Sequence, residues 1–350
     1  CRMAEPGEFT LRAFLNGKMD LSQAEAVADL IASQSKNAHN IAFKQLRGQF
    51  SSELKELREK LIHFASLVEL ELDFAEEDVE FADRTELKLL LDEVLTYLRR
   101  LIQSFELGNA IKNGVPVAIV GEPNTGKSTL LNQLLGEERA IVSSIAGTTR
   151  DVIEETINID GILFRLIDTA GIREGAEEIE ALGIERSFAK IEQASVILCM
   201  ADLSRENHLE EVSNWAKKLQ EKHPLKKTLI VANKADLAQK KIEKCEITTI
   251  HLSAKSGQNI EELKSALVKE VLGNFDLNQD IIVSNARHVE ALEKTVLSLD
   301  QARIGLETNV TADFVAMDIR QAMYWLGTIT GQISEDDILA NIFSKFCIGK

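Results

Sequence analysis

The sequence predicts an α/β unit, built on a mixed and mostly parallel sheet, that is inserted into a discontinuous helical domain. Between about Gly114 and Gly273, apolar runs typical of buried strands alternate with helical segments, as in a doubly wound sheet covered by helices. On both sides of this stretch, apolar residues recur every three or four positions, which indicates helices with one buried face. Neither flank has an obvious core of its own, so we expect the two flanks to pack together.

The segment before the α/β unit should form long helices. One apolar face recurs from Leu54 to Leu72, and a second recurs from Leu87 to Phe105. Such faces can also be seams between subunits, but they more often belong to a core. The acidic stretch Glu76 to Glu80 between them is expected to be a solvated loop.

A phosphate-binding loop should follow the first strand of the α/β unit. The apolar run Val115 to Val120 leads into GEPNTGKS at 121–128, which fits G-x-x-x-x-G-K-[ST]. Its two glycines allow a tight turn that points backbone N–H groups at phosphate oxygens, at the start of the next helix. Lys127 would then reach the β- and γ-phosphates, and the Ser128 hydroxyl would bind Mg²⁺. A chance match in a turn is the alternative, but the flanking strand and helix make it less favourable.

Two neighbouring strands of the sheet are expected to be antiparallel. The runs Ile153 to Ile159 and Ile162 to Ile167 flank Asp160-Gly161, and Asp-Gly between apolar runs is a strong hairpin signal. The sheet should therefore contain one antiparallel pair.

The motif DTAG follows the second strand of this hairpin. Its carboxylate, Asp168, can hold a metal ion through water, and the amide of Gly171 can face the γ-phosphate. The next residue is Ile172, where many GTPases carry a glutamine that orients the attacking water. The group that orients the water must therefore come from another part of the chain. The candidate nucleotide contacts in this motif are Asp168, Thr169, Ala170 and Gly171.

The acidic segment after DTAG is the natural source of that group. Glu177, Glu178 and Glu180 are candidates that spacing alone does not separate. The alternative is a solvated helix start, where acidic residues favour the helix dipole. Arg150 and Arg173 could supply positive charge to the γ-phosphate, although such arginines are more often solvated.

Two later motifs indicate guanine as the base. Asp236 ends the sequence NKAD, which follows the apolar run Thr228 to Ala232. A carboxylate there can accept two hydrogen bonds from the ring N–H and the amino group of guanine, and adenine offers no such pair. The motif SAK should supply a backbone amide for the guanine oxygen. The residues of the two motifs are Asn233, Lys234, Ala235 and Asp236, and Ser253, Ala254 and Lys255.

Helices are expected again after the α/β unit. Apolar positions from Val289 to Leu299, and then Phe314, Met317 and Met323, follow helical spacing. The expected boundaries are 19–112 and 274–350 for the helical domain and 113–273 for the α/β domain.

Composition limits the class of protein. The chain has 350 residues, 45% of them hydrophobic, which is enough for two or three packed domains. Its formal net charge of −16 disfavours a broad basic surface for RNA. No apolar stretch approaches the ~20 residues of a membrane span. With no cleavable signal and four widely spaced cysteines that indicate reduced thiols, we expect a cytoplasmic protein.

Taken together, the motifs resemble those of the MnmE (TrmE) family of tRNA modification GTPases. The resemblance is carried by GEPNTGKSTLLN, IAGTTRDVIEE, IDTAGIREGAEEIEALGIERS, the terminal FCIGK, and PGEFTLRAFLNGKMDLSQAEAVADLI at 6–31. The chain begins without Met inside a family motif, so about one hundred residues, the size of a small domain, are expected to be missing. Residues 1–18 would then be the end of a folate-binding and dimerising domain.

The resemblance implies a G domain that hydrolyses GTP by pairing with a second copy across the nucleotide face, with stimulation by K⁺. It implies that Asn124 in the phosphate loop binds K⁺, that Lys127 and Asn124 take part in catalysis, and that Glu180 orients the water. K⁺ would then replace an arginine finger. The implied metal ligands are Ser128 and Thr149 for Mg²⁺, and Asn124, the backbone of Ser143 and Ile145, and Thr148 for K⁺. The implied nucleotide contacts before DTAG are Asn124, Thr125, Gly126, Lys127, Ser128, Thr129, Ser143, Ser144, Ile145, Ala146, Gly147, Thr148 and Thr149.

The resemblance also implies partners. Family members act with a flavoprotein, MnmG (GidA), which brings FAD, to add an aminomethyl-type or carboxymethylaminomethyl group at C5 of the wobble uridine of certain tRNAs. The one-carbon unit comes from 5,10-methylenetetrahydrofolate, whose pocket would have its edges at Lys18 and Lys350, near Cys347. Without the resemblance, these residues would be two exposed lysines and a buried cysteine at a helix end.

Two other functions fit the five nucleotide motifs. A ribosome-assembly GTPase of the Era or EngA type shares them, but no appended basic RNA-binding domain is visible here. A nucleotide-gated scaffold with negligible turnover is the second possibility.

Overall fold

The computed structural model describes residues 2–73, 84–138, 155–167, 191–238, 246–308 and 311–333. The chain forms two compact units, one of residues Asn113–Asn274 and the other of Cys1–Lys112 together with Phe275–Lys350. The first unit is α/β and the second is helical, so the predicted fold class, an α/β unit inserted into a discontinuous helical domain, is confirmed.

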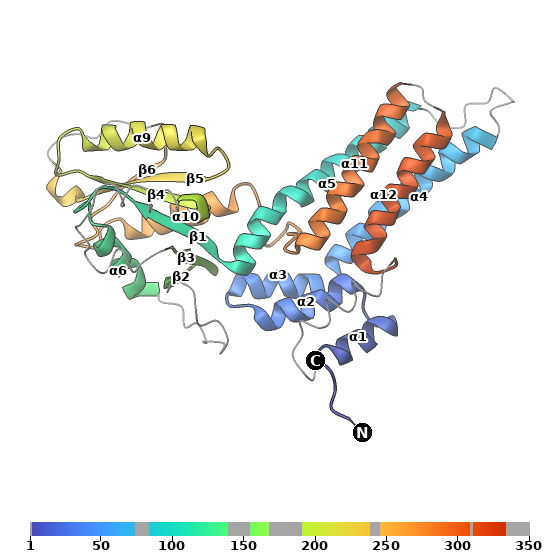
Figure 1. Cartoon of the computed structure of the whole chain (residues 1–350), viewed down its shortest axis with the longest axis horizontal. Helices are drawn as coiled ribbons and strands as arrows, with labels where there is room; N and C mark the ends of the chain where they lie inside the picture. The colour runs from blue at the N-terminus through green and yellow to red at the C-terminus, as the bar shows by residue number, and fades with distance from the viewer. Residues whose placement is uncertain are drawn as a thin grey trace. The chain divides into compact units, whose positions relative to one another are not determined.

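The helical unit contains seven helices among the described residues (Figure 1). They are α1 (Glu8–Leu15), α2 (Leu21–Ala32), α3 (Lys36–Leu46), α4 (Gln49–Asp73) and α5 (Arg84–Asn113) before the insertion, and α11 (Ala286–Glu307) and α12 (Ala312–Thr330) after it. Short polar side chains set several helix starts: Asp20 accepts a hydrogen bond from the Gln23 backbone N–H at 2.9 Å, and Ser35 caps α3 in the same way.

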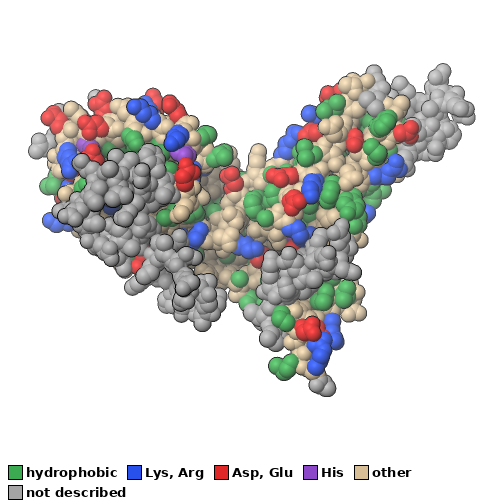
Figure 2. Space-filling model, in the orientation of Figure 1, with side chains coloured by type: hydrophobic (Ala, Val, Ile, Leu, Met, Phe, Trp, Pro, Cys, Tyr) green, Lys and Arg blue, Asp and Glu red, His purple; other side chains and the backbone are tan. Residues whose placement is uncertain are grey.

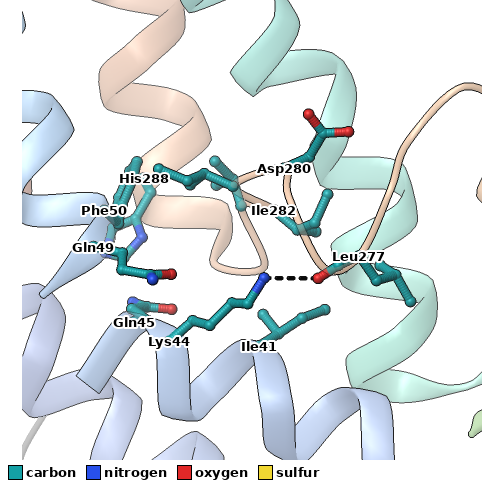
Figure 3. A pocket seen from close by; sticks show the side chains of 11 residues that line it. Ile41, Lys44, Gln45, Gln49, Phe50, Leu277, Asp280, Ile282 and His288 are labelled. Carbon is teal, nitrogen blue, oxygen red and sulfur yellow. Dashed lines mark hydrogen bonds between the residues drawn. The ribbon is translucent and has the colours of Figure 1, made fainter. Parts of the chain in front are cut away.

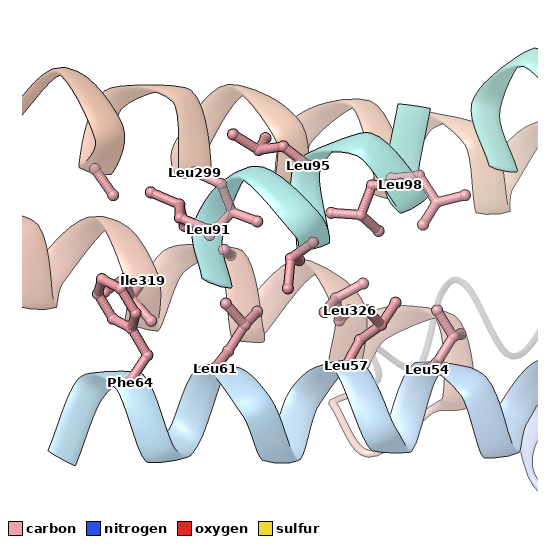
Figure 4. Close-up of a cluster of buried hydrophobic side chains, with 14 of the residues drawn as sticks. Leu54, Leu57, Leu61, Phe64, Leu91, Leu95, Leu98, Leu299, Ile319 and Leu326 are labelled. Atoms are coloured by element: carbon pink, nitrogen blue, oxygen red, sulfur yellow. The ribbon is translucent and has the colours of Figure 1, made fainter. Parts of the chain in front are cut away.

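The core of the helical unit is built from both flanks of the chain (Figure 4). Side chains from α4 and α5 pack with side chains from α11 and α12, and the most enclosed are no more than 1% exposed. They include Leu61, Leu91, Leu98, Leu299 and Ile319. Because neither flank could bury these faces by itself, the two flanks must fold as one domain.

α12 buries only part of the apolar face that the sequence predicts. Met323 packs against the core, but Phe314 and Met317 are 57% and 55% exposed, so the prediction that they pack there is wrong. The buried face instead consists of Val315, Ala316, Ile319, Ala322, Leu326 and Ile329. Gly305 of α11 lies against Val315, and such small residues allow the two helices to approach closely.

A buried charged cluster joins α2, α11 and α12. Glu25 accepts hydrogen bonds from Nε and Nη2 of Arg287, both at 2.8 Å, and lies 2.6 Å from Nε2 of His288. Arg287 also donates to the carbonyl oxygens of Thr328 and Ile329 at 2.7 and 3.0 Å. Burial opposes ionisation of Glu25, but His288 and Arg287 outweigh it and lower the pKa of Glu25 to about 2.

The α/β unit has a six-stranded sheet in the order β2-β3-β1-β4-β5-β6. The strands are β1 (Val115–Val120), β2 (Glu155–Ile159), β3 (Ile162–Leu166), β4 (Val196–Asp202), β5 (Lys227–Asn233) and β6 (Thr249–His251). The described helices are α6 (Lys127–Glu138), α9 (His208–Lys222) and α10 (Ile260–Leu272), with the short 3₁₀ helix η2 (Ala235–Leu237) after β5. Figure 1 shows α9 lying along one face of the sheet.

The predicted hairpin is confirmed. β2 and β3 pair antiparallel, with Ile159 opposite Ile162, and the other neighbouring strands are parallel. Asp160 and Gly161 have φ of 49° and 79°, the left-handed values that a two-residue hairpin turn requires.

β4 is buried along its whole length, and β1 and β5 are buried along most of theirs. Cys199 of β4 is fully buried, and burial raises the pKa of its thiol to about 12. It is therefore a core residue, and its thiol is unreactive. None of the helices in the described ranges combines the length and the hydropathy of a membrane span.

Candidate nucleotide-binding site

The phosphate loop lies between β1 and α6, in the strand-loop-helix arrangement that its motif requires. Gly121 comes directly after the buried β1, and a Cβ there would lie 2.9 Å from both the Cβ and the carbonyl oxygen of Met200 on β4. Only glycine allows this close approach. Thr125 is fully buried, and its hydroxyl donates to the carbonyl oxygen of Glu122 at 2.8 Å, which closes the loop.

Several polar side chains of this loop are exposed at its outer surface. Asn124 is exposed and has a left-handed φ of 64°. Ser128 and Thr129 are exposed in the first turn of α6. The Lys127 ammonium donates to the carbonyl oxygens of Gly121 and Glu122, at 2.8 and 2.6 Å, so it lies over the loop.

Asn233 connects the phosphate loop to the predicted guanine loops. Its amide nitrogen donates to the carbonyl oxygen of Thr125 at 2.8 Å, and its amide oxygen accepts from the backbone N–H of Ala254 at 2.9 Å. The residue is 3% exposed. Gly126 has a φ of 98°, and a Cβ there would collide with the Asn233 amide. One buried side chain therefore brings three of the predicted motifs together.

The rest of NKAD and SAK lies beside this connection. Asp236 is exposed on η2, and the backbone N–H of Ala235 donates to the carbonyl oxygen of Leu252 at 3.0 Å. Ser253 is fully buried, and Lys255 is exposed. The Asp236 carboxylate is thus exposed, and it follows closely in the chain after Asn233, which contacts the phosphate loop. A side chain that recognises a base needs such an accessible position.

Two residues that the motifs do not contain contact this site. Asp202 ends β4, is 1% exposed, and accepts a hydrogen bond from Nζ of Lys234 at 2.6 Å. Burial alone would raise the pKa of Asp202, but the hydrogen bonds from Lys234 and Ser204 hold it below its ordinary value. Arg205 pairs with Glu122 of the phosphate loop at 2.8 Å. Asp202 and Arg205 could have been found from the sequence because they belong to a polar run directly after a buried strand. In such folds, ligands bind at the sheet edge where these strands end.

Several predicted site residues lie outside the described residues. They are Ser143, Ser144, Ile145, Ala146, Gly147, Thr148, Thr149, Asp168, Thr169, Ala170, Gly171, Glu180 and Lys350, together with Arg150, Arg173, Glu177, Glu178 and Cys347. Lys18 is described, and it is exposed in the turn after α1, in the helical unit.

The described part of the site contains side-chain oxygen atoms that could bind a cation. The Ser128 hydroxyl and the Asn124 amide are exposed there, and such oxygen ligands suit Mg²⁺ and other hard cations. Nowhere in the described ranges do three or more His, Cys, Asp or Glu side chains gather as a metal-binding group. The residues present therefore fit a cation that is shared with nucleotide phosphates.

The helical unit has a cavity of about 20 Å³, which is the space of a water molecule and too small for a nucleotide. Lys44 lines it and donates to the carbonyl oxygen of Leu277 (Figure 3). On the face drawn in Figure 2, Lys and Arg side chains are interspersed with Asp and Glu, and no broad basic area is seen there.

Known proteins resemble this chain along its whole length. The family model described as MnmE helical domain matches residues 21–347. The protein called tRNA modification GTPase MnmE in Flavobacterium johnsoniae is 54% identical over 100% of this chain and 77% of its own length. Proteins with the same name in Cytophaga hutchinsonii and Bacteroides thetaiotaomicron are 53% and 51% identical over 100% of this chain, which corresponds to 76% and 77% of their lengths. The chain belongs to the MnmE family.

Membership of the MnmE family confirms the resemblance that the motifs carry. The family model is described by its helical domain, yet its match starts in α2 and continues to residue 347. It therefore covers both helical segments and the α/β unit between them, in agreement with the insertion that the structure shows.

Proposed function

We propose that this protein is a GTP hydrolase that acts in tRNA modification. The observation that carries the proposal is the side chain of Asn233, which ties the phosphate loop at Thr125 to the SAK loop at Ala254. A site for phosphates and a site for a guanine base are thereby held at a fixed separation. The names of the relatives, tRNA modification GTPase MnmE, support the process in which the hydrolase acts.

The positions of the described residues support the proposal of nucleotide binding. The loop before α6 presents backbone N–H groups at a helix N-terminus, where negative charge is stabilised. Lys127 would exchange its two carbonyl partners for phosphate oxygens, and Asp236 would accept hydrogen bonds from guanine. Mg²⁺, when bound through Ser128, would neutralise charge between the phosphates.

We assign the hydrolytic step to Glu180 and a K⁺ ion. Glu180 would orient the attacking water, since Ile172 cannot, and K⁺ would supply the positive charge that an arginine finger provides elsewhere. The proposed ligands of K⁺ are Asn124, the backbone of Ser143 and Ile145, and Thr148, with Thr149 joining Ser128 on Mg²⁺. Two G domains would pair across the nucleotide face in the GTP state.

A cation exchange tests the hydrolytic mechanism. GTP turnover should rise when Na⁺ is replaced by K⁺ at constant ionic strength, and Asn124→Ala should remove most of this gain while GDP still binds. Glu180→Ala should slow turnover with little change in nucleotide binding. Equal rates in the two salts would remove the K⁺ site from the proposal, and unchanged turnover would remove Glu180 from its role.

The wider reaction needs partners. We propose that the protein acts with a flavoprotein of the MnmG (GidA) family on the wobble uridine of tRNA, and that 5,10-methylenetetrahydrofolate supplies the carbon. Lys18 and Lys350 would lie at the edge of the folate pocket. The nucleosides of tRNA from cells with and without the gene test this directly: loss of the C5 substituent is expected, and identical profiles would contradict the proposal.

A further inference from the structure

The connection between β4 and α9, residues Asp202 to His208, contacts two parts of the candidate site. At its start, Asp202 binds Lys234 of the NKAD motif. Three residues later, Arg205 binds Glu122 of the phosphate loop. No nucleotide motif includes this β4–α9 connection, yet it touches both the base-recognition loop and the phosphate loop.

The contact between Asp202 and Lys234 is fixed by several hydrogen bonds to the Asp202 carboxylate. One carboxylate oxygen of Asp202 accepts from Nζ of Lys234 at 2.6 Å, and Nε of Arg205 lies 3.6 Å from the same oxygen. The other oxygen accepts from the backbone N–H and the hydroxyl of Ser204, at 3.0 and 2.6 Å. Because both oxygens are engaged and the side chain is buried, the carboxylate has one orientation. It therefore fixes the position of the lysine ammonium.

The position of Lys234 matters for the residues on either side of it. Lys234 has a left-handed φ of 63°, which costs energy for a residue with a side chain and needs support from surrounding contacts. Asn233 lies before it and holds the phosphate loop, and Asp236 follows on η2. Fixing the Lys234 side chain therefore helps to hold the turn that presents Asp236 to the base.

The second contact involves two donors that face one carboxylate. Arg205 Nη1 lies 2.8 Å from a carboxylate oxygen of Glu122, and Nε2 of His208 lies 3.6 Å from the same oxygen. Nδ1 of His208 accepts from the backbone N–H of Asp202 at 2.9 Å, so in the neutral ring the proton is on Nε2 and faces Glu122. The hydrogen bond from Arg205 therefore holds Glu122 from the β4 side of the loop, while Nε2 of His208 lies beyond hydrogen-bond distance.

We propose that the β4–α9 connection sets how tightly the site holds a guanine nucleotide, and that Asp202 is a positioning residue that acts through Lys234. The inference rests on the proposed function, because it concerns the same site. It assigns to Asp202 and Arg205 a role in nucleotide retention, separate from the hydrolytic step.

Asp202→Asn tests the inference with little change in size. Dissociation of a fluorescent GDP analogue, measured by stopped flow in the full-length protein, should become about tenfold faster, as expected for loss of one charged hydrogen bond. The KM for GTP should rise, while kcat at saturating GTP should change little. Glu210→Gln on the exposed side of α9 removes the same charge nearby and should leave dissociation unchanged.

A double-mutant cycle separates positioning from general loss of structure. If Asp202 acts through Lys234, then Asp202→Asn should add little to the effect of Lys234→Met. Additive effects, or a tenfold loss of kcat without a change in KM, would overturn the proposal. Arg205→Gln lies at the surface and should speed dissociation even if the Asp202 variant fails to fold.

The outcomes also distinguish this inference from the proposed function. If the unmodified protein does not bind the GDP analogue, then the proposed function fails. If the unmodified protein binds it and both variants release it at the same rate, then only the inference about the β4–α9 connection fails.

Discussion

Gly126 lies where the phosphate loop meets the amide of Asn233, and this contact leaves no space for any residue other than glycine. Its φ of 98° suits glycine alone, and a side chain would displace the Asn233 amide from the carbonyl oxygen of Thr125. The hydrogen bond at risk joins residues that are 108 positions apart in the chain.

We therefore expect Gly126→Ala to weaken binding of a fluorescent GDP analogue by about tenfold or more, since backbone strain and a lost buried hydrogen bond combine. Equilibrium titration measures the effect. Gly136→Ala is the matched control, because no atom lies within 4 Å of a Cβ at that position of α6. Wild-type affinity in the Gly126 variant would show that nucleotide binding does not need the hydrogen bond from Asn233 to Thr125.

Folding changes the ionisation of Glu25, a buried carboxylate of the helical unit. Its pKa of about 2 lies below the ordinary value of 4.5, so the folded state favours the ionised form. The stabilisation is complete above pH 4.5 and is lost as the pH falls through about 2. The size of the shift corresponds to roughly 3 kcal/mol.

Glu25→Gln should therefore destabilise the helical unit at pH 7 by about 3 kcal/mol, because the half-buried Arg287 and the buried His288 would lose their carboxylate partner. The variant should also lose less stability than the parent between pH 4.5 and pH 2. Urea unfolding can be followed by Trp325 fluorescence in a Trp215→Phe background, since the chain has two tryptophans. Glu59→Gln, an exposed control on α4, should change stability by less than about 0.5 kcal/mol. Parallel pH curves for the Glu25 variant and its parent would contradict the assigned pKa.

At the scale of elements, α5 packs against the segment that returns from the insertion. The hydroxyl of Ser104 accepts from the backbone N–H of Val283 at 3.0 Å. One turn later, a Cβ on Gly108 would collide with the backbone of Val283. The helix therefore needs glycine at this position, although alanine is the better helix former.

Gly108→Ala should destabilise the helical unit by about 1–3 kcal/mol, because the neighbour in its path is backbone rather than a movable side chain. Unfolding monitored at Trp325 measures this. Leu89→Ala on the same helix removes a side chain that is 65% exposed and should have little effect. A more stable Gly108 variant would show that helix propensity dominates at this contact.

The helices could be predicted from the sequence because their apolar spacing is local, and α12 shows where this fails. Its sequence contains two overlapping apolar faces, one with Phe314 and Met317 and the other with Val315 and Ile319. Spacing alone cannot choose between them. Close packing against α11 at Gly305 decides, and that contact belongs to the tertiary structure.

The sequence also predicts only part of the candidate site. The motifs identify the loops because each loop needs particular residue types at fixed spacing. They do not reveal Asp202 or Arg205, whose partners are 32 and 83 positions away. Such contacts depend on strand order, which brings the ends of β1, β4 and β5 to one edge of the sheet.

At the scale of the whole molecule, the helical unit has a core that excludes the α/β unit. The buried side chains of α4, α5, α11 and α12 pack with one another, and Gly108 and Val283 lie in contact on either side of the insertion. Replacing residues 113–274 by a short Gly/Ser linker should thus leave a helical protein that unfolds cooperatively and binds no GDP. Circular dichroism and Trp325 fluorescence measure its folding. A disordered product would show that the helical unit needs the α/β unit to fold.

The contact between Gly108 and Val283 also has a consequence for the ends of the insertion. The chain leaves the helical unit through α5, and the segment that returns lies with its backbone against the same helix. Departure and return are therefore fastened to each other inside the helical unit, which closes the inserted chain into a loop on one helix.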